Sequence, residues 1–180
     1  LVSMIHQLRQ QDPDLPITVM TRKPRQTGAL TGVSAIHIFN TRAAGRVMKK
    51  SRLYISGGGS LIQNVTSTRS LLYYLYSIRQ AKRAGCRVMM YGCGIGPVNG
   101  EKYRARTAEI LEKNVDLITL RDLESQETLR SFGVRTPRVR ITADPALLME
   151  GDDAAAERYL TRNGLDSDGR YALYVLRPWD

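Results

Sequence analysis

The chain has 180 residues, of which 42% are hydrophobic and 24% charged, a composition that fits one folded domain and excludes a disordered chain. No apolar run approaches the ~18 to 20 residues that a helix needs to cross a bilayer, so the sequence also excludes a transmembrane protein. Two cysteines, Cys86 and Cys93, are too few for a disulfide scaffold or a four-ligand zinc site. We therefore expect two reduced thiols, no metal and a cytoplasmic protein.

Charge is distributed unevenly along the sequence. The formal net charge is +10, yet residues 1–100 hold 14 Lys and Arg against two acids, Asp12 and Asp14, whereas residues 101–180 hold 13 Lys and Arg against 15 acids. A basic first half attracts anions, which include nucleic acids, anionic membranes and small phosphorylated or carboxylated substrates. Because the basic residues are scattered singly and no nucleic-acid motif accompanies them, a nucleic-acid partner is not expected.

The predicted elements of the first half mix helices and strands. In chain order, they are a helix from residue 1 that ends at 12–13, strands over 16–20 and 35–39, a helix over 41–50, a strand over 53–55 and a helix over 69–84. Gly85 is expected to cap the last of these helices.

In the second half the alternation is regular. The expected order is a strand over 87–91, a loop over 92–97, a helix over 101–114, a strand over 116–120, a helix over 122–132, a strand over 139–142, a helix over 154–163 and a strand over 171–176. This alternation predicts an α/β protein with a Rossmann-like, doubly wound and mainly parallel sheet.

The two ends of the chain do not match a complete doubly wound domain, which usually opens with a strand and a loop. This sequence opens on a predicted helix and closes on a predicted strand. We therefore expect residues 1–150 to form a Rossmann-like N-terminal domain without its first strand and loop. Residues 151–180 are then the start of a truncated C-terminal domain.

Polar or glycine-rich segments follow four of the predicted strands, where open parallel sheets bind their ligands. These segments are residues 55–70, 92–97, 119–125 and 142–145. The first, I-S-G-G-G-S-L-I-Q-N-V-T-S-T-R-S, combines glycines that let a ligand approach the backbone with hydroxyls, an amide and one arginine. It lacks the G-K-[ST] ending of a phosphate-binding P-loop, and neither glycine loop is a good dinucleotide signature.

Structural interpretations of the same segments stay open. The glycines of residues 55–70 are also compatible with a tight turn, and Asp122 is expected to cap a helix. Asp144 either contacts a sugar hydroxyl or fixes its own turn. Neither His6 nor His37 lies beside a nucleophile in the sequence, so no catalytic residue is assigned.

Together, these segments resemble the polysaccharide pyruvyl transferase family, in particular the CsaB type linked to bacterial cell-wall polysaccharide. The resemblance rests on G-G-G-S-L-I-Q-N-V-T-S-T-R-S (57–70), G-C-G-I-G-P (92–97), D-L-I-T-L-R-D-L-E-S (116–125), T-A-D-P-A (142–146) and L-R-P-W (176–179). It implies the N-terminal domain of an enzyme with the two-domain glycosyltransferase-B (GT-B) architecture. The chain departs from the family at Asn64, a position that is often Asp.

The resemblance implies transfer of the enolpyruvyl unit of phosphoenolpyruvate to two hydroxyls of a sugar, which yields a cyclic pyruvate ketal and phosphate. The implied acceptor is a lipid-linked or polymeric saccharide containing N-acetylmannosamine, and the ketal would serve S-layer anchoring. A membrane-borne acceptor implies peripheral contact with the inner face of the cell membrane. Phosphoenolpyruvate is the donor substrate, and no cofactor is implied. The general acid is expected in the C-terminal domain, so these residues alone should be inactive.

The predicted substrate contacts belong to the four segments and to the end of the chain. They are Gly58, Gly59, Ser60, Asn64, Thr66, Ser67, Arg69, Gly94, Ile95, Arg121, Asp144 and Arg177. Two alternatives stay open at this point. One is a GT-B glycosyltransferase that uses a nucleotide sugar, and the other is a non-catalytic α/β module that binds polyanions.

Overall fold

The computed structural model describes residues 1–166, 169–171 and 174, and it divides the chain into two compact units, Leu1–Leu148 and Met149–Asp180. Among the described residues, no helix is both long and apolar enough to cross a membrane. The second unit contains the helix α7 (Asp153–Arg162), which Asp152 caps by accepting a hydrogen bond of 2.8 Å from the Ala155 amide. The predicted strand over 171–176 lies largely outside the described residues.

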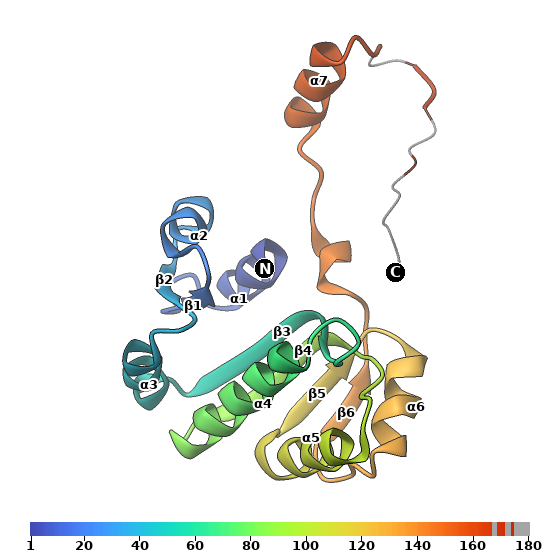
Figure 1. Cartoon of the computed structure of the whole chain (residues 1–180). Helices are drawn as coiled ribbons and strands as arrows, with labels where there is room; N and C mark the ends of the chain where they lie inside the picture. Colours follow the sequence, from blue (N-terminus) through green and yellow to red (C-terminus); the bar gives the residue numbers. More distant parts are fainter. Residues whose placement is uncertain (167–168, 172–173, 175–180) are drawn as a thin grey trace. The chain divides into compact units, whose positions relative to one another are not determined.

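A four-stranded parallel sheet forms the centre of the first unit, and its strands pair in chain order (Figure 1). The strands are β3 (Leu53–Ile62), β4 (Arg87–Ile95), β5 (Leu117–Leu120) and β6 (Arg138–Ile141). The helices that connect them are α4 (Thr68–Arg83), α5 (Glu101–Asn114) and α6 (Leu123–Ser131). This alternation confirms the predicted Rossmann-like α/β fold class.

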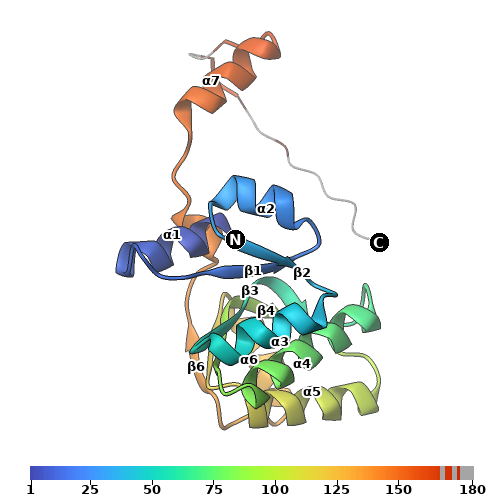
Figure 2. The same ribbon diagram turned by 90° about the vertical axis from the view of Figure 1, so that its left-hand side faces the viewer.

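The beginning of the chain forms a smaller parallel pair of strands (Figure 2). Its elements are α1 (Val2–Gln11), β1 (Thr18–Thr21), α2 (Pro24–Thr31) and β2 (Ser34–His37), followed by α3 (Thr41–Lys50). The sequence did not predict α2. This helix begins with Pro24 and ends at Gly32 in the left-handed conformation, which are ordinary boundary signals. It buries no residue, however, and therefore lacks the apolar period on which helix prediction depends.

The core lies between the four-stranded sheet and the helices α4, α5 and α6. In α4, the fully buried Leu71, Leu75 and Ile78 follow the spacing of one helix face. Their partners include Val88, Met90, Leu111, Ile118, Leu120 and Leu129. Helices α4 and α5 lie side by side along one face of the sheet in both ribbon views.

Strands β3 and β4 are longer than predicted. Sequence reasoning ended them at residues 55 and 91, whereas the structure continues β3 to Ile62 and β4 to Ile95. The residues interpreted as glycine loops still pair, with Gly57 opposite Tyr91 and Gly59 opposite Cys93 before the register shifts. Backbone pairing does not need side chains, so the glycine runs extend the sheet toward its carboxyl edge.

Candidate functional site

A row of polar groups crosses the carboxyl edge of the four-stranded sheet. Arg121, directly after β5, donates from Nη1 to Asp144 Oδ2 after β6 over 2.8 Å and from Nη2 to Ser60 Oγ in β3 over 3.0 Å. Gly94 of β4 lies beneath them, because an added Cβ would come within 2.8 Å of Ser60 Oγ and 3.3 Å of Arg121 Nε. Four predicted contacts from four different strands therefore form one cluster.

Two carboxylates balance the charge of Arg121. Asp144 is hydrogen-bonded to it, and Asp122 Oδ2 lies 3.6 Å from Arg121 Nε. The Ala146 amide and the Arg121 guanidinium lower the pKa of Asp144. Hydrogen bonds from Ser125, together with the charge of Arg121, lower the pKa of Asp122. Both carboxylates are therefore ionised at neutral pH, and the cluster carries one net negative charge.

The turn between β3 and α4 has the opposite electrostatic character. Before this turn, Gly58 and Gly59 lie within β3 and have φ values of +72° and +82°, a backbone region that favours glycine. Ser67 then caps α4 by accepting a hydrogen bond of 3.3 Å from the Ser70 amide. The first turn of α4 holds no acid, and its exposed Arg69 has no carboxylate within 4.0 Å among the described residues.

Asn64 joins the turn after β3 to the turn after β4. Its Oδ1 accepts a hydrogen bond from the Asn99 amide over 2.7 Å, and its Nδ2 donates to the Asn99 carbonyl over 2.9 Å. Thr66 is held locally, since its Oγ1 accepts a hydrogen bond of 2.7 Å from Gln63 Nε2. These hydrogen bonds give Asn64 and Thr66 a structural role. That either residue also contacts a ligand stays a prediction.

Replacing Asn64 with alanine should lower the free energy of unfolding by about 1–2 kcal/mol, because the Asn99 amide loses its acceptor and the Asn99 carbonyl its donor. Urea denaturation measures the change. Asn99→Ala is the matched control, since Asn64 contacts only the backbone of that residue. Equal losses in the two variants would contradict the role assigned to the Asn64 side chain.

Ile95 lies in the interior rather than at an open surface. Its side chain is buried, and its amide donates to Ser125 Oγ over 2.8 Å. The backbone amide of Ser125 in turn donates a hydrogen bond to Asp122 Oδ1, so Asp122 caps α6 as the sequence predicted. Sequence reasoning missed the bond between Ile95 and Ser125, because residues 30 positions apart give no local signal.

Both cysteines are buried free thiols. Burial raises the pKa of Cys93 to about 12 and also raises the pKa of Cys86 above its usual value. We expect both thiols to react with an aromatic disulfide reagent at pH 8 at least ~100-fold more slowly in the folded protein than in guanidinium, because the thiolate is the reactive form. Rapid modification of either thiol in the native protein would overturn this assignment.

The remaining site predictions concern residues that do not belong to the cluster around Arg121. Arg177 lies outside the described residues. Within the part of the chain that the structure describes, no three His, Cys, Asp or Glu side chains gather in a way that could hold a metal ion. The structure thus brings together Ser60, Gly94, Arg121 and Asp144, while Arg69 stands in a separate basic turn.

Comparison with known proteins gives one match. The sequence model of a family described as "Polysaccharide pyruvyl transferase" matches residues 1–176. Searches of curated proteins and of solved structures found no match. The matched region covers the whole four-stranded sheet and every predicted site residue except Arg177. The chain therefore belongs to the polysaccharide pyruvyl transferase family.

Proposed function

We propose that this chain binds phosphoenolpyruvate and a saccharide acceptor as the N-terminal domain of a GT-B-like pyruvyl transferase. The enolpyruvyl unit is transferred to two hydroxyls of one sugar, which gives a cyclic pyruvate ketal and free phosphate. The acceptor sugar is N-acetylmannosamine in a lipid-linked or polymeric saccharide. The family match supports the transferase class, and phosphoenolpyruvate and N-acetylmannosamine are the donor and acceptor that we propose.

The observation that carries the proposal is the distribution of charge along the carboxyl edge of the sheet. The cluster around Arg121 is negative, whereas the first turn of α4 holds Arg69 and no acid. Phosphoenolpyruvate carries a carboxylate and a phosphate, so it needs donors and an arginine that is free of competing acids. Arg69 meets this need, since it stands beside the unpaired amides at the start of α4 without an acid in that turn. We therefore assign the donor to Gly58, Gly59, Ser67 and Arg69.

The acceptor is assigned to the cluster around Arg121. Sugar hydroxyls both donate and accept hydrogen bonds, and the cluster offers carboxylate acceptors on Asp144 and guanidinium donors on Arg121. Its net negative charge repels an anionic donor but not a neutral sugar. Ser60, which already accepts a hydrogen bond from Arg121, belongs to β3, the strand that leads into the turn before α4.

The reaction needs a group that protonates the methylene carbon of phosphoenolpyruvate and thereby makes the centre that the acceptor hydroxyl attacks. Asp122 and Asp144 do not suit this role, because their lowered pKa values leave them ionised at neutral pH. Cys93 retains its proton, yet its side chain is fully buried. In line with the family resemblance, we assign the general acid to the C-terminal domain.

Thermal unfolding with and without phosphoenolpyruvate tests the proposal. A ligand at ~100 times its dissociation constant should stabilise the fold by about 2.7 kcal/mol. The expected result is a shift with phosphoenolpyruvate that weakens as salt is raised and is absent with nucleotide sugars. A shift with a nucleotide sugar and none with phosphoenolpyruvate would replace the proposal with the glycosyltransferase alternative.

A further inference from the structure

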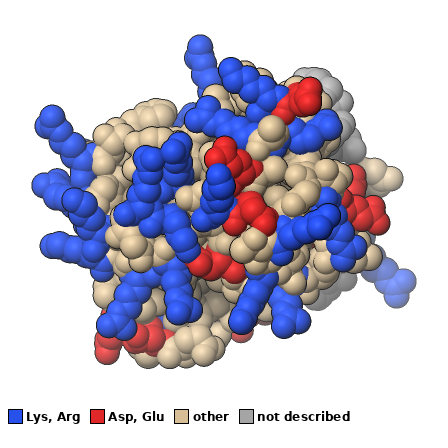
Figure 3. Space-filling model, turned by 90° about the horizontal axis from the view of Figure 1, so that it is seen from below, with Lys and Arg blue, Asp and Glu red and all other residues tan. Residues whose placement is uncertain are grey.

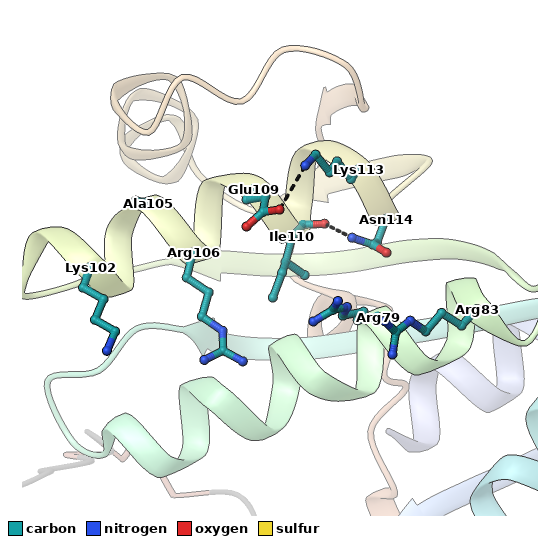
Figure 4. A pocket seen from close by; sticks show the side chains of 9 residues that line it. All are labelled: Arg79, Arg83, Lys102, Ala105, Arg106, Glu109, Ile110, Lys113 and Asn114. Atoms are coloured by element: carbon teal, nitrogen blue, oxygen red, sulfur yellow. Dashed lines mark hydrogen bonds and ion pairs between the residues drawn. The ribbon is translucent and has the colours of Figure 1, made fainter.

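A second feature lies away from the strand ends, in a groove of about 670 Å³ between α4 and α5 (Figure 4). Helix α4 lines it with Arg79 and Arg83, and α5 lines it with Lys102, Arg106 and Lys113. Five cations from two neighbouring helices thus face one concave surface. Figure 3 shows that Lys and Arg outnumber Asp and Glu on the face seen from below, where several acids lie among them.

The charge of this groove is largely uncompensated. Its one carboxylate, Glu109, forms an ion pair of 2.9 Å with Lys113. The hydrogen bond and charge of Lys113, with smaller contributions from Arg79 and Arg106, lower the pKa of Glu109, so it is ionised at neutral pH. The other four cations of the groove have no carboxylate within 4.0 Å in the described ranges 1–166, 169–171 and 174. The groove therefore holds about four net positive charges at neutral pH.

These charges are spread along a line. Arg106 lies one turn after Lys102 on α5, and Lys113 lies two turns after Arg106, so at 1.5 Å per residue the three cover about 16 Å. Arg79 and Arg83 lie one turn apart on α4 and border the same groove. A single phosphate or carboxylate would meet only a part of this row. An extended polymer with repeated negative charges would meet all of it.

The lining distinguishes between classes of polymer. None of its nine residues is aromatic, so nucleic-acid bases would find no side chain on which to stack. Its apolar lining residues are Ala105 and Ile110, which offer no large side chain for insertion into a bilayer. Arginine and lysine suit carboxylates, and Asn114 and Glu109 can bind sugar hydroxyls.

We propose that the α4–α5 groove is a second binding site, which holds an extended segment of an anionic polysaccharide. The affinity for anions follows from the groove itself, whereas the choice of a polysaccharide rests on the proposed function. Helix α5 begins six residues after β4 ends, so the Lys102 end of the groove lies toward the carboxyl edge of the sheet. The groove would hold the body of a polymer whose modified sugar occupies the cluster around Arg121.

Binding of fluorescent polygalacturonate, measured by anisotropy without any donor, tests the site separately from turnover. The double variant Arg79→Gln/Arg106→Gln should bind at least ~10-fold more weakly at low salt. The slope of log Kd against log salt should also become shallower by about one to two units, because fewer counterions are released. Arg9→Gln/Arg25→Gln is the matched control, since it removes the same charge from exposed positions on α1 and α2 and should bind normally.

Thermal melting of each variant checks that the fold is intact. Lys102→Gln is a single substitution in the exposed first turn of α5, and it should weaken binding about twofold to fivefold. Equal losses in the control pair, or equal binding of neutral dextran, would overturn the proposal. Stronger binding of a single-stranded oligonucleotide through Arg79 and Arg106 would replace the polysaccharide with nucleic acid. Binding of phosphatidylglycerol vesicles in place of polygalacturonate would identify a membrane surface instead.

Discussion

Replacing Arg69 with alanine should remove most of the stabilisation that phosphoenolpyruvate gives the protein. A charge-assisted hydrogen bond contributes about 1.5–3 kcal/mol to binding, which corresponds to a loss of affinity of roughly 10- to 150-fold. At a concentration that is ~100 times the original Kd, a 50-fold loss leaves about 0.6 kcal/mol of the original 2.7 kcal/mol. In a chain of this size, the thermal shift should fall from about 5–11 °C to about 1–3 °C.

Two further arginines serve as controls for this experiment. Arg9→Ala removes an exposed cation from α1 and should leave the shift unchanged. Arg121→Ala should reduce the shift only slightly, because Asp122 and Asp144 already balance that charge. Loss of the shift in Arg121→Ala but not in Arg69→Ala would move the donor to the cluster and refute the division of charge proposed above.

Replacing Gly92 with alanine should lower the free energy of unfolding by about 2–5 kcal/mol. Gly92 has a φ of +55°, where a Cβ costs about 1–2 kcal/mol. An added Cβ would also overlap the ring of the buried Pro145, and overpacking of this kind costs about 1–3 kcal/mol. Urea denaturation should therefore show a much lower midpoint with an unchanged slope.

Gly133→Ala separates the two contributions. Gly133 also has a positive φ, +81°, but an added Cβ there would meet no atom within 4 Å. Its substitution should cost only about 1–2 kcal/mol. Pro145→Ala should recover part of the loss in the Gly92→Ala background, since it removes the overlapping ring. Equal costs for Gly92→Ala and Gly133→Ala would show that Pro145 adjusts freely.

Sequence reasoning located the cluster because it depends on a general property of parallel sheets. Arg121 and Asp144 follow parallel strands, and Ser60 lies near the end of another, so their meeting at one edge of the sheet could be expected. It did not predict that Arg121 turns toward Asp144, 23 residues away, or that this pairing leaves the cluster negative. Such contacts depend on side-chain direction and tertiary packing, which local patterns do not encode.

The same limit explains the errors in the fold. Helix α2 buries no residue, so its short sequence lacked an apolar period. The glycines at 57–59 were interpreted as a loop because glycine is poor in strands, yet neighbouring β4 holds them in the ladder. Tertiary pairing overrode local preference at these positions. Helices with a buried face, such as α4 and α5, were predicted within a residue of their observed ends.

Two hydrogen bonds between the Asn64 side chain and the Asn99 backbone link the turn after β3 to the turn after β4. If the proposed donor site is correct, a ligand that shifts the turn after β3 should also displace the turn after β4, which follows Gly94 of the cluster around Arg121. Linkage then requires reciprocity: if donor binding strengthens acceptor binding by some factor, acceptor binding strengthens donor binding by the same factor. Asn64→Ala should reduce this coupling even where each ligand alone still binds.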